Sequence, residues 1–133
     1  MIIDADRLIV GRLATFVAKQ ALLGETIDII NSERAVITGN KQSILELYKA
    51  RRSRGDPHYG PYYPRTPERI LKRAIRGMLS HKRGRGKIAF SGIKCYKGVP
   101  AEFKGKATIP LDRARLKDDH IKFMTLQRIS ELL

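Results

Sequence analysis

The chain of 133 residues contains one cysteine and no tryptophan. A single thiol, Cys95, excludes an intramolecular disulfide framework and any zinc site built on cysteines. It lies in an apolar stretch, which predicts a buried structural thiol. No apolar run approaches the roughly 20 residues that cross a bilayer, and the first seven residues lack the apolar core of a signal peptide. We therefore expect a cytoplasmic protein.

Acidic residues are scarce in one segment. Between Lys49 and Lys87 there are 13 Lys and Arg and only 2 acids, Asp56 and Glu68, so this segment holds +11 of the formal net charge of +14. Such a cluster repels itself and costs folding free energy unless a polyanion supplies the missing charge. Phosphates do so at high density and release condensed counterions. Nucleic acid is therefore the first partner to consider, and an anionic membrane surface the second.

Length and composition predict a single domain over residues 1–133 with a substantial core, since 42% of the residues are hydrophobic. Short apolar runs alternate with segments of helical spacing, which predicts an α/β fold with a parallel or mixed sheet covered on both faces. Strand-like runs lie at residues 1–3, 8–10, 26–30, 35–38, 88–90 and 93–96. Helical patterns lie at about residues 12–23, 41–52 and 125–133.

The segment from Gly55 to Pro64 is rich in proline, glycine and tyrosine, which predicts an extended, semi-rigid loop. The helix that follows has the clearest start signal, with Thr66 as N-cap, Pro67 at the first position and Glu68 in the first turn. An apolar stripe at helical spacing continues from there. Its members are Ile70, Leu71, Ala74, Ile75, Met78 and Leu79.

The basic segment has three parts: the end of the second helix, the Tyr/Pro loop and the turn at 81–87. Arginine can hold a phosphate through two hydrogen bonds and also stack on a base. Glycine beside arginine lets a backbone approach phosphate, and exposed tyrosines can stack on unpaired bases. The candidate RNA-binding residues are Arg51, Arg52, Arg54, His58, Tyr59, Tyr62, Tyr63, Arg65, Arg73, Arg76, His81, Lys82, Arg83, Arg85 and Lys87.

Some of these candidates have a second interpretation. The three tyrosines at 59, 62 and 63 fit packing of the loop against the body as well as base stacking. His58 and His81 fit contacts to phosphate or sugar and equally fit simple surface or capping positions. A solvated charged face is the alternative for the whole segment, but such faces usually alternate in sign, and this one does not.

Signals for catalysis are thin. Gly84-Arg-Gly86-Lys-Ile-Ala89 matches a dinucleotide-binding pattern, but we expect it after a helix and before a strand, the reverse of the phosphate-binding context. Asp118-Asp119-His120 is predicted to be a solvated turn. No acid pair lies in the basic segment, where a nuclease would hold a divalent metal. We expect no catalytic residue, no metal site, no cofactor and no small-molecule substrate.

Two alternatives from other classes stay open at this point. An RNA-processing or RNA-modifying enzyme on a Rossmann-like sheet would need a cofactor pocket or a metal site. A membrane-surface module would need a continuous amphipathic helix with bulky aromatic residues on its apolar side, which the basic segment lacks. We therefore expect no membrane partner.

Three blocks of residues follow the order and spacing of a known family. The first block is Ile3-Asp4-Ala5 with Gly11-Arg12-Leu13-Ala14 and Ala18-Lys19, and the second is Ile29-Ile30-Asn31 with Ile37-Thr38-Gly39-Asn40-Lys41. The third and most specific block consists of Gly55-Asp56-Pro57, Arg65-Thr66-Pro67, Arg69-Ile70, Arg76-Gly77-Met78-Leu79-Ser80-His81-Lys82, Arg85-Gly86 and Gly98-Val99-Pro100. Over about residues 3–100 the chain resembles the L-thirteen family of large-subunit ribosomal proteins, in its archaeal and eukaryotic form. Ser80 stands where that family commonly has proline.

The resemblance implies a three-layer α/β/α domain around a mainly parallel, four-stranded sheet, with the basic segment at about 49–87 facing RNA. It also implies a structural constituent of the large ribosomal subunit that binds large-subunit ribosomal RNA, supports subunit assembly and translation, and contacts neighbouring ribosomal proteins. Enzymatic activity is not part of that role. Beyond residue 100 the resemblance is weak and implies nothing for the tail.

Overall fold

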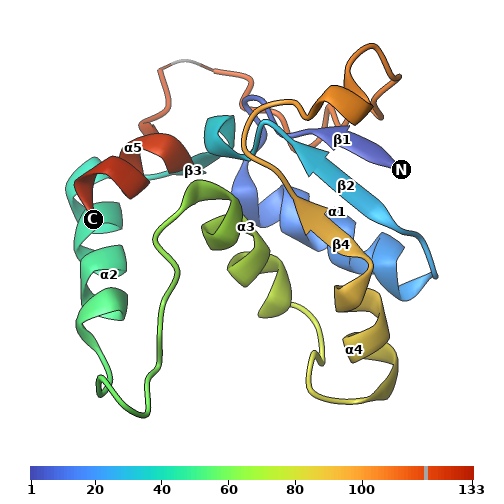
Figure 1. Ribbon diagram of the computed structural model, residues 1–133. Helices are drawn as coiled ribbons and strands as arrows, with labels where there is room; N and C mark the ends of the chain where they lie inside the picture. The colour runs from blue at the N-terminus through green and yellow to red at the C-terminus, as the bar shows by residue number, and fades with distance from the viewer. Residues whose placement is uncertain (119) are drawn as a thin grey trace.

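A computed structural model describes residues 1–118 and 120–133. Its helices and strands, in chain order, are β1 (Ile2–Asp4), α1 (Val10–Leu22), β2 (Ile27–Ile30), the 3-10 turn η1 (Ser32–Arg34), β3 (Val36–Thr38), α2 (Lys41–Ser53), α3 (Pro67–Arg76), α4 (Gly84–Ser91), β4 (Ile93–Cys95), the 3-10 turn η2 (Ala101–Phe103), β5 (Phe123–Thr125) and α5 (Leu126–Leu132) (Figure 1). Asp119, in the middle of the predicted turn at 118–120, lies outside the described residues. The α/β class is confirmed.

The central sheet is parallel, with the strand order β1-β2-β4. Ile27 and Ile29 of β2 and Ile93 of β4 are fully buried, while Asp28 is half-buried and Lys94 is exposed. Because successive side chains of a strand point to opposite faces, this alternation means that one face of the sheet carries most of the core. The other face is covered as well, as the sequence predicts: Ile30, on the same face as Asp28, is only 4% exposed.

The positions of the helices relative to the sheet follow from this strand order. Right-handed crossovers that move in one direction across a sheet place their helices on the same face, and α1 accordingly packs against both α3 and α4. Figure 1 shows α1 behind the sheet. On the other face, the Tyr96 ring lies 5.4 Å from the ring of Phe103 in η2, so the irregular segment after β4 folds back there. Among the described residues this sheet has three strands, one fewer than the resemblance implies.

The predicted strand at 35–38 forms, but outside the central sheet. It is β3, which pairs antiparallel with β5 and sets Ile37 opposite Met124. The Thr125 hydroxyl oxygen then accepts a hydrogen bond from the backbone N–H of Arg128 at 3.2 Å, which caps α5 as a threonine N-cap does. Leu126 is fully buried. The tail after residue 100 thus completes the core beside β3.

The third helix begins where the sequence predicts. Thr66 is the N-cap residue and Pro67 the first helical residue, although the Thr66 side chain makes no hydrogen bond with the helix. The buried members of the predicted stripe are Ile70, Leu71, Ile75 and Leu79. Met78 is 45% exposed and lies beyond the end of the helix at Arg76.

The prediction of a strand at 88–90 was wrong, because residues 84–91 form α4. A run of three apolar residues does not distinguish a strand from a helix, and in α4 Ala89 is buried while Ile88 is 74% exposed. The glycine pattern at 84–89 therefore opens a helix, whereas the sequence had suggested that it precedes a strand. The glycine pattern follows α3 and the turn after it. A dinucleotide-binding site requires a strand directly before these glycines, and α4 is preceded by a helix instead.

Cys95 in β4 supplies a direct test of this packing. Burial raises the pKa of its thiol to about 12, and only the thiolate attacks alkylating reagents. At about pH 8 we expect iodoacetamide to modify the folded chain on the order of 1,000-fold more slowly than the urea-unfolded chain, whose thiol has a pKa of about 8.5. Mass spectrometry of timed samples gives both rates, and equal rates would mean that the thiol is not buried in the folded chain.

Candidate nucleic-acid interface

The basic segment gathers at one edge of the molecule. Figure 1 shows the C-terminal end of α2, the tip of the loop at 54–66, the end of α3 and the turn into α4 along the lower side, while the second half of the loop rises to the start of α3. The two helix ends face a shared concavity, which Arg51 and Arg54 line from α2, and Arg73 and Met78 from α3 and its following turn. Three parts of the chain that are separate in sequence thus present their cations together.

The end of α2 holds the loop in place. Arg51 donates a hydrogen bond from Nη1 to the Tyr63 hydroxyl at 3.2 Å, and its guanidinium carbon lies 5.3 Å from the ring centroid of Tyr48. The rings of Tyr48 and Tyr63 meet edge to face, with centroids 6.0 Å apart. Arg51 and Tyr63 therefore join the loop to α2, while Arg52 and Arg54 are exposed.

The other loop candidates face solvent. Tyr59 is 89% exposed and Tyr62 is 70% exposed, and both His58 and Arg65 are exposed. The Tyr62 hydroxyl donates to the carbonyl oxygen of Pro57 at 2.8 Å, so its ring is held in one orientation. Of the three tyrosines, Tyr59 and Tyr62 thus have exposed rings, and Tyr63 packs against the body.

The tip of the loop is a tight hairpin. The backbone N–H of Asp56 donates to the Gly60 carbonyl at 3.1 Å, and the N–H of Gly60 donates back at 2.8 Å. Gly55 has a φ of +107°, and a Cβ there would lie 2.6 Å from the carbonyl carbon of Gly60. Only glycine fits such a conformation and such a contact, so the glycines give the exposed aromatic loop a defined shape.

One face of α3 adds four cations to this edge. Arg69, Lys72, Arg73 and Arg76 line a pocket of about 480 Å³ together with loop residues 61–64 and Phe90 of α4. The sequence prediction includes Arg73 and Arg76 but misses the other two and Phe90. The i, i+3, i+4, i+7 spacing of the four cations was a sequence signal for the two that were missed. Phe90 had no such signal, because residues 88–90 were predicted to form a strand and not part of a helix.

The turn before α4 and α4 itself carry the remaining candidate residues. Lys82, Arg83 and Lys87 are exposed, whereas His81 is half-buried with its ring 6.5 Å from that of Phe90. Gly86 is buried, and a Cβ on it would lie 2.6 Å from the carbonyl carbon of Ser80. This glycine therefore lets the basic turn fold tightly onto α4, and the sequence-based idea that it lets the backbone approach a phosphate was wrong for Gly86.

Arg85 is bound to the body of the protein. Its Nε and Nη2 atoms donate to the carbonyl oxygen of Leu22 at 3.2 and 2.8 Å, at the C-terminus of α1. A cation there satisfies a free carbonyl and complements the helix dipole. Arg85 thus differs from Arg83, although the sequence assigns both the same role.

We expect alanine substitutions of Arg85 and Arg83 to have different effects on the free energy of unfolding. Arg85→Ala removes a charge-assisted hydrogen bond at an exposed site and should lower the free energy of unfolding by about 1 kcal/mol. Arg83→Ala, an exposed residue on the same turn, should change it by less than about 0.5 kcal/mol. Urea unfolding followed by circular dichroism gives both values, and equal effects would contradict the capping role of Arg85.

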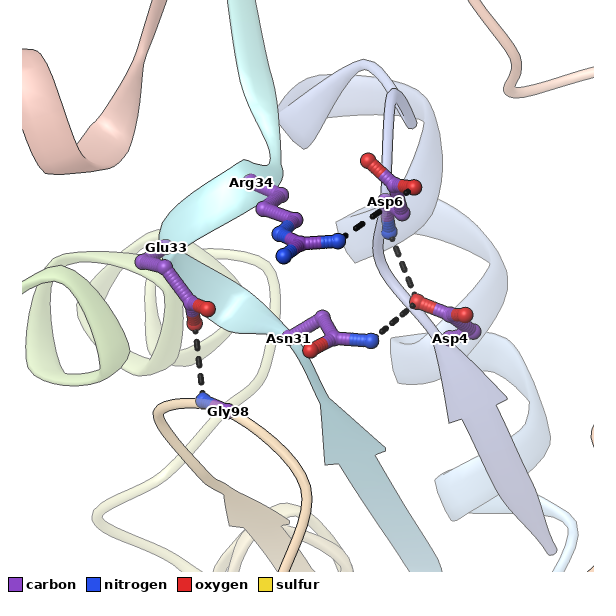
Figure 2. A network of polar contacts seen from close by, with 6 residues as sticks. All are labelled: Asp4, Asp6, Asn31, Glu33, Arg34 and Gly98. Carbon is purple, nitrogen blue, oxygen red and sulfur yellow. Dashed lines mark hydrogen bonds and ion pairs between the residues drawn. The ribbon is translucent and has the colours of Figure 1, made fainter.

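A second polar cluster lies at the carboxyl ends of the parallel strands (Figure 2). Asp4 Oδ1 accepts hydrogen bonds from the backbone N–H of Asp6 and from Asn31 Nδ2, both at 3.0 Å. Glu33 Oε2 accepts from the backbone N–H of Gly98 at 2.9 Å. Ligands of open α/β sheets often bind at this edge, but here its side chains bind one another and are mainly acidic, which does not suit a polyanion.

The histidines do not come together. His58 lies in the loop, His81 lies beside Phe90, and the backbone N–H of exposed His120 donates to Asp118 Oδ1 at 2.9 Å. Within residues 1–118 and 120–133, no three His, Cys, Asp or Glu are placed to hold a metal ion. In the same part of the chain, no helix has the length and apolar character needed to cross a membrane.

Known proteins are similar in sequence to most of this chain. Residues 1–102 match the family model described as Ribosomal protein L13. The large ribosomal subunit protein uL13 of Methanosarcina barkeri is 51% identical over 117 residues, which cover 87% of this chain and 84% of the relative. The uL13 proteins of Methanococcoides burtonii and Haloarcula marismortui are 44% and 46% identical over 133 residues, covering 99% and 100% of this chain and 96% and 90% of theirs.

Proposed function

Because the chain belongs to the ribosomal protein L13 family, we propose that it binds large-subunit ribosomal RNA through its basic edge. The relatives that carry the family assignment are named large ribosomal subunit proteins and come from archaea. Membership makes the chain a structural ribosomal component and not an enzyme, which argues against the alternative of an RNA-modifying enzyme. Its place is the ribosome, which is cytoplasmic in archaea.

One observation carries this proposal: the positive charge of residues 49–87 is concentrated on one edge, and most of it is exposed. Its neutralisation by RNA phosphates would remove the self-repulsion of the segment and release counterions. The exposed cations that would hold phosphates are Arg52, Arg54, Arg65, Arg69, Lys82, Arg83 and Lys87. The exposed rings of Tyr59 and Tyr62 would stack on nucleotides.

The candidates that bind other parts of the protein have supporting roles in this proposal. Arg51 and Tyr63 hold the loop against α2, and Arg85 holds α4 against the end of α1. His81 packs beside Phe90 and steadies the turn that carries Lys82 and Arg83. The scaffold fixes the relative positions of the exposed cations before RNA binds, so little conformational entropy is lost on binding.

Recognition would depend mainly on RNA shape and charge. Helical RNA hides its base edges in a deep, narrow groove, so proteins contact its phosphates and 2′-hydroxyls and read unpaired bases by stacking. In this proposal the single domain of residues 1–133 docks by its basic edge during subunit assembly. The remaining surface is then free for neighbouring large-subunit proteins, and no small-molecule substrate takes part.

The test is binding of the purified chain to transcribed fragments of archaeal large-subunit ribosomal RNA, with bulk transfer RNA as competitor. Saturable binding to one fragment that survives the competitor is the expected result. Equal binding to every fragment and to transfer RNA would mean that the basic edge only tethers polyanions, and the proposal would fail.

A further inference from the structure

The pocket between the loop and α3 has the size of a single nucleotide. Its outer wall is formed by residues 61–64 of the loop, and its inner wall by α3 and by Phe90 of α4. Its volume of about 480 Å³ lies within the range of roughly 300–1,000 Å³ that small-ligand sites occupy. An RNA helix cannot enter a space of this size, whereas one residue that has left its stack can.

The charges that line the pocket have no counter-charge there. Arg69, Lys72, Arg73 and Arg76 are its ionic residues, and no acid is among the lining residues. Like charges spaced three and four residues apart on a helix repel one another. A phosphate would relieve this repulsion, because it accepts paired hydrogen bonds from a guanidinium.

Aromatic rings form two sides of the same pocket. The Tyr62 ring is 70% exposed and is held by the hydrogen bond from its hydroxyl to Pro57. Phe90 lies across from it on α4, and the Lys72 ammonium sits 5.1 Å from its ring centroid. Lys72 and Phe90 both line the pocket, and the His81 ring lies 6.5 Å from that of Phe90. Rings in this position are typical of sites that stack unpaired bases.

We infer that this pocket receives one unpaired nucleotide of the bound RNA, with its base between Tyr62 and Phe90 and its phosphate on the arginines of α3. The inference rests on the proposed function and adds to it a site of defined chemistry. Arg69, Lys72 and Phe90 thereby become RNA-binding residues. Tyr63 forms the floor between this pocket and the concavity next to α2, since it lines both.

The test uses the full chain labelled with ¹⁵N and three probes: a single-stranded RNA tetranucleotide, a short RNA duplex and inorganic phosphate. The tetranucleotide should shift the amide signals of α3 and α4 around the pocket at a concentration at which the duplex and phosphate leave them unchanged. The proposal is overturned if the tetranucleotide leaves those signals unchanged. It is also overturned if phosphate or the duplex shifts them with equal affinity, because the pocket would then hold backbone phosphate alone.

A matched pair of variants tests the base contact. Phe90→Leu removes the aromatic face and should weaken tetranucleotide binding roughly 10-fold. Phe103→Leu removes a second ring that also has an ammonium nearby, Lys106 at 5.8 Å, and should leave the affinity unchanged. Equal losses, or none, overturn the proposal. If Phe90→Leu does not fold, the exposed Arg69→Gln variant replaces it, with Lys94→Gln on the sheet as its control.

The same variants separate this inference from the proposed function. Binding of the unaltered chain to its ribosomal RNA fragment tests the function. If that binding is intact and Phe90→Leu retains full affinity for both fragment and tetranucleotide, the nucleotide pocket is refuted and the ribosomal RNA function stands. If the unaltered chain binds no fragment selectively, the proposed function fails, and the pocket inference that rests on it fails too.

Discussion

The affinity of the chain for its ribosomal RNA fragment should fall by roughly 10³ to 10⁵ between about 50 and 200 mM salt. This figure corresponds to about six to ten neutralised phosphates, a number that the exposed cations of the basic edge can supply. Each neutralised phosphate releases condensed counterions, and added salt opposes that release. Filter binding or fluorescence anisotropy over a salt series gives the slope of log affinity against log salt.

Variants of the basic turn make the salt experiment specific. Replacing Lys82 and Arg83 by glutamine should reduce the magnitude of the slope by about two, one for each lost phosphate contact. Replacing Lys94, exposed on the sheet away from this edge, should leave the slope unchanged. A shallow slope for the unaltered chain, or an equal change for Lys94→Gln, would show that the basic edge does not carry binding.

Leu71→Ala should lower the free energy of unfolding by about 3 to 5 kcal/mol. Leu71 is fully buried in α3, where it packs in the main core, and its truncation leaves a cavity that the surrounding helices and sheet cannot fill completely. For a marginally stable domain such a loss is a large part of the total. Urea unfolding followed by circular dichroism measures it.

The control is the same substitution in a different place. Leu47 lies on α2 and is 48% exposed, so Leu47→Ala should cost less than about 1 kcal/mol. At low temperature, where Leu71→Ala is still folded, its RNA affinity should stay close to that of the unaltered chain. Equal losses of stability for the two leucines would contradict the described core. Loss of RNA affinity in the folded Leu71→Ala variant would show that core and interface are not separable.

Sequence reasoning succeeded where the determining interactions are local. α1, α2 and α5 lie within about two residues of their predicted ranges, and α3 begins at its predicted residue, although it ends at Arg76, before the last members of its predicted stripe. Helical spacing of apolar residues and N-terminal signals act within a few turns, so they can be read from the sequence. The position of Thr66 and Pro67 at the start of α3 is one example. The basic segment was equally accessible, since net charge is a property of composition.

Sequence reasoning failed where the partner is distant. The run at 88–90 is helical because Gly86 packs on Ser80 and Ala89 enters the core. The strand at 35–38 leaves the central sheet because its pairing partner, β5, comes some 85 residues later, in a part of the tail where the sequence predicted no strand. Pairing with a distant strand decides which sheet a short strand joins, and local propensity does not encode that pairing.

The sequence by itself determined that the chain is an α/β domain with one strongly basic segment, because amphipathic periods and charge counts do not depend on how the chain folds back on itself. Only the tertiary structure decided which of the fifteen candidate residues are free to bind. Arg85 meets Leu22 across 63 positions, Arg51 meets Tyr63, and Phe90 comes to face the cations of α3. Hydrogen bonds and ring contacts act over a few ångströms, so they depend on where folding brings distant residues together.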